Sequence, residues 1–257
     1  QIYRAITRSE KPLLITDITT AETIKYACNA FLATKISFIN EMANFCEKVG
    51  ANIDDVAKGM GLDSRIGPRF LQAGLGYGGS CFPKDIKALM QMGEKFGYHF
   101  KIIRATDEVN AQQKLKVLEK LQKHLSDLNY RTIAIWGLSF KPNTDDIREA
   151  PSIVIVKKLL REFPKIKINV FDPQALRNFL SLFRGKVKGC KDMYEALTGA
   201  EALLILTDWD EFKFPDFAKM KRKLKRPLII DGRNLYEPDL MKTVSYTHLT
   251  LPTTERV

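Results

Sequence analysis

The stretch Thr132-Ile-Ala-Ile-Trp-Gly137 is a short apolar run that ends at a glycine. Such a run is typical of a strand buried in a parallel sheet. Apolar runs of the same kind recur at 166–171, 202–206 and 228–231. Helical segments separate them, and one of these begins at Pro151. Strands that alternate with helices predict a doubly wound α/β domain with a parallel sheet, which we assign to residues 129–244.

Upstream of that sheet the sequence is helical. The segment from Thr20 to Gly50 has apolar residues at helical spacing and no internal glycine or proline. It predicts a helix over about 40 Å long. Because the apolar residues are spread widely around this 20–49 helix, we expect it to be the spine of a homodimer. Residues 20–128 are expected to form an all-α domain, whose other helices are predicted at 53–60, 83–96 and 105–125.

Bulk composition excludes several classes of protein. The chain has 257 residues and the composition of a soluble globular protein with room for two domains. Its net charge of +11 suits a phosphate-bearing ligand. We interpret the densest basic run, Lys219 to Arg226, as a solvated helix face, with nucleic-acid binding as the alternative. Since we interpret that run as a solvated face, we predict that the protein does not bind nucleic acid. No apolar run approaches the ~18 to 20 residues of a membrane span, so we also predict no membrane binding.

The thiols and the chain ends give further expectations. The cysteines are scattered, with no CxxC pair, at Cys28, Cys46, Cys81 and Cys190. This pattern indicates neither a metal site nor a disulfide framework, and reduced thiols predict a cytoplasmic protein. Since the chain starts at Gln1, we expect a fragment in which residues 1–19 end a linker. Residues 245–257 are rich in threonine and follow no earlier pattern, so we expect a non-native tail outside the fold.

The segment Gly74-Leu-Gly-Tyr-Gly-Gly-Ser-Cys-Phe-Pro-Lys-Asp85 has four glycines just ahead of a cysteine. Pro83 is typical of the first turn of a helix, which places Cys81 at a helix N-terminus with Lys84 close by. Both features favour the thiolate and its nucleophilicity. The glycines would let backbone N–H groups approach a ligand. The alternative is a small packed thiol in a flexible loop. The other three cysteines, two in the long helix and one near a strand end, are expected to be packing residues. No histidine lies near Cys81 in sequence, so a Cys–His hydrolase is not favoured.

Two further spots carry candidate residues. Lys25 and Asn29 are four residues apart and share one face of the long helix. A lysine among apolar neighbours either extends its ammonium to solvent or is poised for chemistry. In the loop 141–149, which follows the first strand, Lys141 and Arg148 would lie at the ligand edge of the sheet. The alternative there is a polar crossover loop.

Taken together, these motifs resemble the UDP-glucose/GDP-mannose dehydrogenase family. The resemblance covers about residues 3–241 and rests on four segments in order: Lys25-Tyr-Ala-Cys-Asn29, Gly76-Tyr-Gly-Gly-Ser-Cys-Phe-Pro-Lys-Asp85, Gly137-Leu-Ser-Phe-Lys-Pro-Asn-Thr-Asp-Asp-Ile-Arg148 and Asp231-Gly-Arg233. It implies a helical dimerisation domain followed by a Rossmann-like UDP-binding domain. The family's N-terminal NAD-binding Rossmann domain would be missing from this sequence, and no strand of the sheet is followed by a GxGxxG motif.

The resemblance also implies the chemistry. UDP-glucose would be oxidised twice with NAD to UDP-glucuronate, through a covalent adduct on Cys81. Lys25 and Asn29 would stabilise the oxyanion and Asp85 would assist proton transfer. Lys84 and Arg148 would contact NAD. The UDP-glucose ligands implied are Arg65 (from the partner subunit), Phe70, Tyr77, Gly78, Lys141 and Arg233.

Other functions remain open at this stage. GDP-mannose and UDP-N-acetyl-hexosamine dehydrogenases have a similar cysteine loop. A non-catalytic UDP-sugar-binding or dimerisation module is a second class, against which the intact Cys81, Lys25, Asn29 and Asp85 speak. A thiol-dependent acyl transferase would lack a base for the cysteine. Under the leading hypothesis we expect this chain alone to be inactive, because hydride transfer needs the NAD domain.

Overall fold

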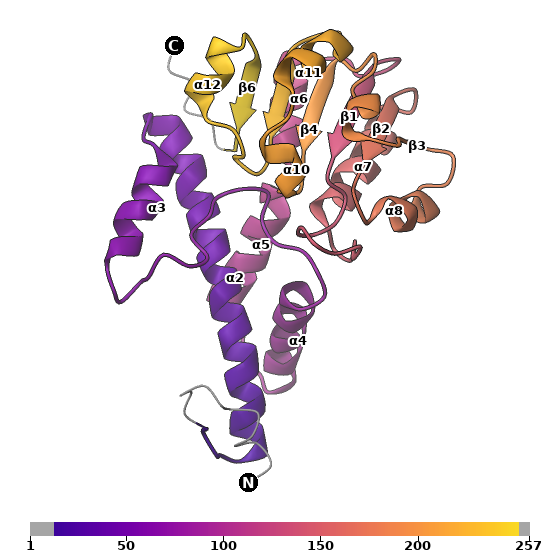
Figure 1. Cartoon of the computed structure of the whole chain (residues 1–257). Coiled ribbons are helices and arrows are strands. Elements are labelled where there is room, and N and C mark those ends of the chain that lie inside the picture. Colours follow the sequence, from indigo (N-terminus) through magenta and orange to yellow (C-terminus); the bar gives the residue numbers. More distant parts are fainter. Residues whose placement is uncertain (1–12, 252–257) are drawn as a thin grey trace.

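A long helix, α2 (Ile18–Val49), runs through the N-terminal half of the computed structural model, which describes residues 13–251 (Figure 1). The Asp17 carboxylate accepts a hydrogen bond from the Thr20 backbone N–H at 2.9 Å and caps the start of the helix. Gly50 ends it, because its φ of +75° lies in the left-handed region that glycine adopts without strain. The helix expected at 20–49 is therefore present and begins two residues earlier.

Shorter helices pack beside α2. Both α4 (Phe82–Lys95) and α5 (Lys101–Gln113) contact it, and α3 (Ile53–Leu62) follows it in the chain (Figure 1). The single helix expected over 105–125 is wrong, because α5 ends at Gln113 and α6 (Lys116–His124) begins three residues later. The buried side chains of α5 are polar, whereas α6 buries leucine and valine against the sheet. The two segments pack on different partners, which explains the break.

Six parallel strands form one sheet in the order β3-β2-β1-β4-β5-β6. Their bounds are β1 (Thr132–Trp136), β2 (Lys167–Phe171), β3 (Lys188–Gly189), β4 (Ala202–Ile205), β5 (Leu228–Asp231) and β6 (Thr247–Thr250). Strand order reverses between β1 and β4, which is where ligands of such sheets bind. The predicted architecture, a helical region followed by a parallel α/β sheet, is confirmed.

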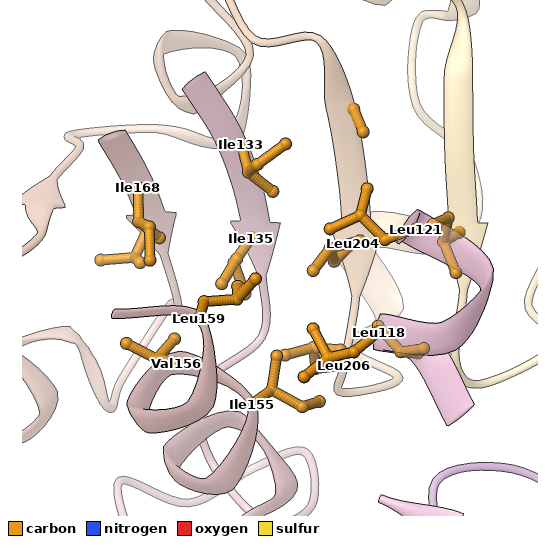
Figure 2. Packing of buried hydrophobic residues seen from close by; sticks show 14 of the residues in the cluster. Leu118, Leu121, Ile133, Ile135, Ile155, Val156, Leu159, Ile168, Leu204 and Leu206 are labelled. Carbon is orange, nitrogen blue, oxygen red and sulfur yellow. The ribbon is translucent and has the colours of Figure 1, made fainter. Parts of the chain in front are cut away.

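Side chains of alternate strand residues divide the core into two layers. Ile133 and Ile135 of β1 face a cluster built with α6, α7 (Pro151–Glu162) and α8 (Leu176–Leu182) (Figure 2). Ala134 and Trp136 face the opposite layer, where the Trp136 indole donates to the Met193 carbonyl at 2.8 Å. That layer contains α9 (Met193–Ala196), α10 (Asp210–Lys213), α11 (Phe217–Lys223) and α12 (Pro238–Thr243). Both faces of the sheet are covered, as its continuous apolar strands require.

The C-terminal segment differs from the expectation that it lies outside the fold. Residues 247–250 form β6, which pairs in parallel with β5 at the sheet edge. Leu249 and Leu251 are buried there, since an apolar side chain at every second position suits a strand. Residues 252–257, and most of the expected linker at 1–19, lie outside the described residues. Within residues 13–251, no helix combines the length and the apolar character that crossing a membrane requires.

Candidate active site

Asp85 is the centre of a cluster of polar side chains from α2 and α4. One of its carboxylate oxygens accepts from Lys25 Nζ at 2.8 Å and from Asn29 Nδ2 at 2.6 Å, and the other accepts from Lys84 Nζ. The i, i+4 spacing on α2 puts Lys25 and Asn29 on the face that meets α4. Four residues predicted as functional therefore converge, although Lys25 and Asp85 are 60 residues apart in the chain.

The carboxylate of Asp85 is buried, whereas its cationic partners reach into solvent. The Asp85 side chain is 1% exposed and that of Lys25 is 58% exposed. Burial alone would raise the pKa of Asp85, but hydrogen bonds from Lys25, Lys84 and Asn29 outweigh it and lower the pKa to about 2. Asp85 is therefore ionised at neutral pH. The Lys25 side chain thus extends into solvent while its ammonium is bound to Asp85, and a chemical role for it stays a prediction.

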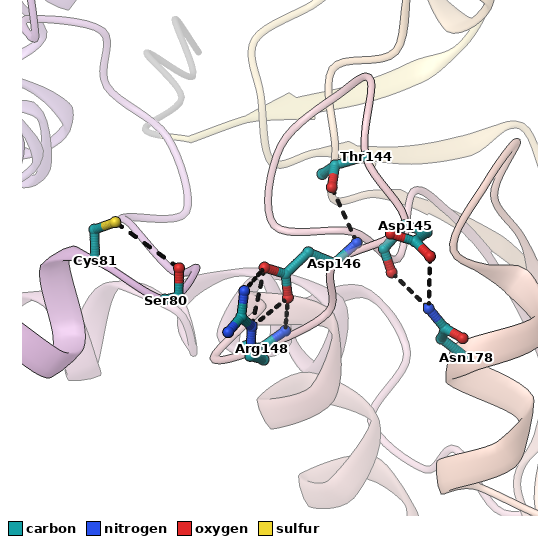
Figure 3. Close-up of polar contacts among 7 residues, drawn as sticks. All are labelled: Ser80, Cys81, Thr144, Asp145, Asp146, Arg148 and Asn178. Carbon is teal, nitrogen blue, oxygen red and sulfur yellow. Dashed lines mark hydrogen bonds and ion pairs between the residues drawn. The ribbon is translucent and has the colours of Figure 1, made fainter.

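Cys81 is exposed and is the N-cap residue of α4, as the sequence predicts. Its Sγ lies 3.8 Å from Ser80 Oγ (Figure 3). Lys84 follows Cys81 by three residues on α4, and the Arg148 carbonyl binds Gly79, two residues before the thiol. Cys46 and Cys190 are buried as expected, but Cys28, which was also expected to pack, is exposed. An accessible thiol thus lies at a helix start, next to the segment that the loop 141–149 contacts.

The loop 141–149 brings Arg148 from the α/β domain to the segment that precedes Cys81 (Figure 3). Its guanidinium binds the Asp146 carboxylate through both Nε, at 3.0 Å, and Nη2, at 2.6 Å. Its carbonyl accepts from the Gly79 backbone N–H at 2.8 Å. The loop is therefore attached to the glycine segment and is not a free crossover connection.

The glycines ahead of Cys81 make close contacts with the protein itself. A Cβ at Gly76 would lie 2.3 Å from Asn110 Oδ1, and one at Gly78 would lie 2.4 Å from the Glu149 carbonyl oxygen. Gly79 has a φ of +80° and faces the Phe140 ring. From the sequence, we expect these glycines to make room for a ligand. In the structure they let the loop fit between the helical region and the α/β domain.

Lys141 and Arg233 reach the same loop from the carboxyl edge of the sheet. Lys141 Nζ lies 5.4 Å from the centre of the Phe140 ring, which packs on Gly79. Arg233 follows β5, and its Nε donates to the Leu206 carbonyl at 2.9 Å. The side chain of Arg233 also lies near Gly74. Both cations are therefore placed where the sheet edge meets the glycine segment.

The aromatic residues predicted to bind substrate differ in exposure. Phe70 is half-buried and lies edge-on to Phe82, with ring centres 6.3 Å apart. Tyr77 is 5% exposed and also lies edge-on to Phe82, with ring centres 5.6 Å apart, and burial raises the pKa of its phenol. Among the residues that the structure describes, the Tyr77 hydroxyl has no hydrogen-bond partner. Phe82 follows Cys81 in the chain and contacts both rings, although the sequence did not predict it as a site residue.

Arg65 is placed apart from this cluster in the single chain. It lies beyond α3, is largely exposed, and binds the Asp63 carboxylate, with Nη2 at 2.6 Å. The expectation that it reaches the site of a partner subunit concerns an assembly and stays a prediction. Among residues 13–251, no group of histidine, cysteine and acidic side chains is arranged to hold a metal ion.

A carboxylate occupies the turn after β1, where a dinucleotide's phosphates would sit. Asp172, at the end of β2, is buried and accepts from the backbone N–H groups of Leu138 at 2.6 Å and Ser139 at 3.1 Å. The N–H groups of this turn are therefore not free to bind the diphosphate of NAD. Lys84 and Arg148 are exposed cations of the kind that a dinucleotide diphosphate needs, and their contact with NAD stays a prediction.

Comparison with known proteins gives two domain matches. Residues 19–112 match the central domain of the UDP-glucose/GDP-mannose dehydrogenase family, and residues 134–238 match its UDP-binding domain. A UDP-glucose 6-dehydrogenase of Bacillus subtilis is 47% identical over 237 residues, which are 92% of this chain and 51% of that protein. One of Pseudomonas aeruginosa is 43% identical over 254 residues, 96% of this chain and 56% of that protein. The chain spans about half the length of the curated relatives it matches.

Solved structures share the fold. A UDP-glucose dehydrogenase from the archaeon Pyrobaculum islandicum has a TM-score of 0.82 and 34% identity, covering 90% of this chain and 51% of its own. An NDP-N-acetyl-D-galactosaminuronic acid dehydrogenase from Methanosarcina mazei has a TM-score of 0.78 and 26% identity, covering 91% and 50%. These two proteins are named for different sugars, so a likeness of fold does not by itself select the sugar.

Proposed function

Because the chain belongs to the UDP-glucose/GDP-mannose dehydrogenase family, of which it carries the central and UDP-binding domains, we propose that it acts in the oxidation of UDP-glucose to UDP-glucuronate. The observation that carries this proposal is the convergence of Lys25, Asn29 and Asp85 next to the exposed thiol of Cys81. A cationic, hydrogen-bonding cluster beside a nucleophile is what the oxidation of an aldehyde to an acid requires.

Cys81 supplies the covalent step. Its sulfur adds to the C6 aldehyde left by the first oxidation and forms a thiohemiacetal. Loss of a hydride from that carbon gives a thioester, and water then attacks the thioester carbonyl, releasing the carboxylate and restoring the thiol. When bound, NAD supplies the chemistry of hydride acceptance for each oxidation. Lys84 and Arg148 would hold its diphosphate.

Lys25, Asn29 and Asp85 stabilise the developing negative charge and assist proton transfer. The Lys25 ammonium and the Asn29 amide stabilise the oxygen anion that develops on C6. The ionised Asp85 fixes both donors in one orientation before substrate binds. Once substrate oxygen draws a donor from Asp85, the freed carboxylate oxygen can accept a hydrogen bond from the attacking water and so assist proton transfer.

The substrate class follows from the cations and rings around the loop. Lys141 and Arg233 would bind the UDP diphosphate, and the half-buried Phe70 would pack on the base or sugar. Because Tyr77 and Gly78 are buried, we propose that they shape the pocket through their backbone. Relatives named for UDP-glucose favour that sugar. GDP-mannose and UDP-N-acetyl-hexosamines are the alternatives that the assay below must separate.

We further propose that α2 forms a homodimer interface. Ile24, Phe31, Phe38 and Phe45 recur every seven residues and are all exposed. Seven residues are about two helical turns, so these side chains form one apolar stripe along α2. A second copy would cover the stripe and bring its Arg65 towards this site. The four free cysteines suit a reducing compartment, and we propose the cytoplasm.

The test uses two forms of the protein: the 257-residue chain, and an extended protein in which a family NAD-binding domain precedes it. We expect the chain to bind UDP-glucose by calorimetry but not to form NADH, and the extended protein to form NADH. UDP-glucose should be oxidised faster than GDP-mannose or a UDP-N-acetyl-hexosamine. Cys81→Ser should bind UDP-glucose and produce no net UDP-glucuronate, whereas Cys28→Ser, the matched control at another exposed thiol, should keep the full rate. A fully active Cys81→Ser protein would refute the covalent mechanism.

A further inference from the structure

Three buried amide side chains hold the backbone of the loop that precedes Cys81. Asn110 of α5 accepts from the Tyr77 backbone N–H at 2.8 Å and donates to the Tyr77 carbonyl at 3.2 Å. At Gly74, the N–H donates to Asn40 Oδ1 at 2.8 Å and the carbonyl accepts from Gln113 Nε2 at 2.7 Å. The helices α2 and α5 thus pair with two loop residues much as a neighbouring strand would.

Burial makes these contacts obligatory. Asn40, Asn110 and Gln113 are each no more than 3% exposed, so water cannot replace an amide that is removed. A buried peptide group without a partner is costly, and asparagine is a poor residue for the middle of a helix. Asn110 is therefore in α5 for the sake of the loop rather than of the helix.

The fit between Asn110 and the loop is also steric. A Cβ at Gly76 would lie 2.3 Å from Asn110 Oδ1, and the φ of Gly76 is +80°. Only glycine allows this approach, since both the space and the backbone conformation exclude a larger residue. Asn110 and Gly76 therefore set the position of the loop together.

The loop has a second attachment beyond Tyr77. The Gly79 N–H donates to the Arg148 carbonyl, two residues before Cys81 begins the turn into α4. Between the two attachments the chain has little freedom, so a shift at Tyr77 would strain the hydrogen bond from Gly79 to Arg148 and move Cys81 relative to Arg148. We propose that Asn110 is a positioning residue, which fixes the loop so that the Cys81 thiol keeps its place relative to Arg148.

This inference rests on the proposed role of Cys81, but part of its test does not. In the 257-residue chain, amide hydrogen exchange of the 74–80 segment is compared between Asn110→Ala and Gln112→Ala, an exposed amide of the same helix that serves as the matched control. Losing the two hydrogen bonds to Tyr77 should speed exchange of the segment at least about tenfold in Asn110→Ala, whereas Gln112→Ala should leave it unchanged. Unchanged exchange in Asn110→Ala would overturn the proposal.

A chemical readout separates positioning from general destabilisation. Alkylation of Cys81 by iodoacetamide is measured by peptide mass spectrometry, and the alkylation ratio is the Cys81 rate in a variant divided by the Cys81 rate in Gln112→Ala. Cys81 is already accessible, so a displaced loop adds no access but shifts the thiol relative to Arg148. We expect the alkylation ratio to fall to about one fifth in Asn110→Ala. A ratio of one would reduce Asn110 to a structural residue.

A second variant covers the case in which Asn110→Ala fails to fold. Gly76→Ala disrupts the same contact from the side of the loop, and it should also lower the alkylation ratio. In the double variant, the Cβ at position 76 no longer meets the Asn110 amide. The combined effect should therefore be smaller than the sum of the two single effects, and an additive result would contradict a shared contact. If the extended protein forms no NADH while these ratios behave as expected, the proposed function fails and the positioning role stands.

Discussion

Asp85 and Asp172 are two buried carboxylates held in opposite ways. Asp85 accepts hydrogen bonds from three side chains, two of them lysines whose stems lie in solvent. Asp172 accepts from the backbone N–H groups of the turns after β1 and β2, and from the Trp209 indole at 3.1 Å. Side-chain donors can turn towards a ligand, whereas backbone donors cannot leave without opening the turn. The helical region therefore holds a carboxylate that can exchange partners, and the sheet edge holds one that is part of the fold.

The largest effect that would test this contrast is on stability. Asp172→Ala leaves several buried N–H groups without an acceptor, so we expect the free energy of unfolding to fall by about 3 to 5 kcal/mol. Denaturant titration of the 257-residue chain measures it, with Asp210→Ala, a largely exposed carboxylate, as the control. Asp85→Ala should cost much less, because its lysine partners can be solvated. Equal losses for Asp85 and Asp172 would abolish the distinction.

The next effect is on catalysis. Lys25→Met removes the cation that we place at the developing oxyanion but leaves Asn29 and Lys84 on Asp85. We expect kcat of the extended protein to fall about a hundredfold, as for the loss of one oxyanion donor, with little change in KM or in stability. Lys48→Met, at an exposed position of the same helix, should keep the wild-type rate. A rise in KM with kcat unchanged would instead make Lys25 a substrate-binding residue.

The sequence predicts the elements that carry the site better than it predicts the contacts between them. The apolar runs predicted the strands, and the i, i+4 spacing placed Lys25 and Asn29 on one face. Nothing local to either segment pairs them with Asp85, which became a partner only through the family resemblance. Asn110 and Gln113 were missed because an amide on an amphipathic helix is usually part of its solvated face. Whether such an amide is buried depends on what packs against it, here a loop about 35 residues away.

A smaller effect concerns acid stability. The pKa of Asp85 is lowered from 3.8 to about 2, so its contribution to stability is full above pH 3.8 and is lost as pH falls through 2. The shift corresponds to an upper limit of about 2 kcal/mol, and solvent around the lysines should reduce it to about 1 kcal/mol. The stability difference between the chain and its Asp85→Asn variant should therefore shrink between these pH values. A difference that stays constant with pH would mean that the cations do not stabilise the carboxylate.

The smallest effect is expected at Asp146, a carboxylate of a third kind, because its guanidinium partner lies in solvent. The Arg148 side chain is 68% exposed, so water competes for the guanidinium and loss of the pair should change the unfolding midpoint little. Asp146 does, however, hold the guanidinium in one orientation through two nitrogens. Asp146→Asn should therefore raise the KM for NAD in the extended protein about two- to threefold at constant kcat. A loss of stability as large as that of Asp172→Ala would instead mean that Asp146, and the loop that carries Arg148, stabilise the fold.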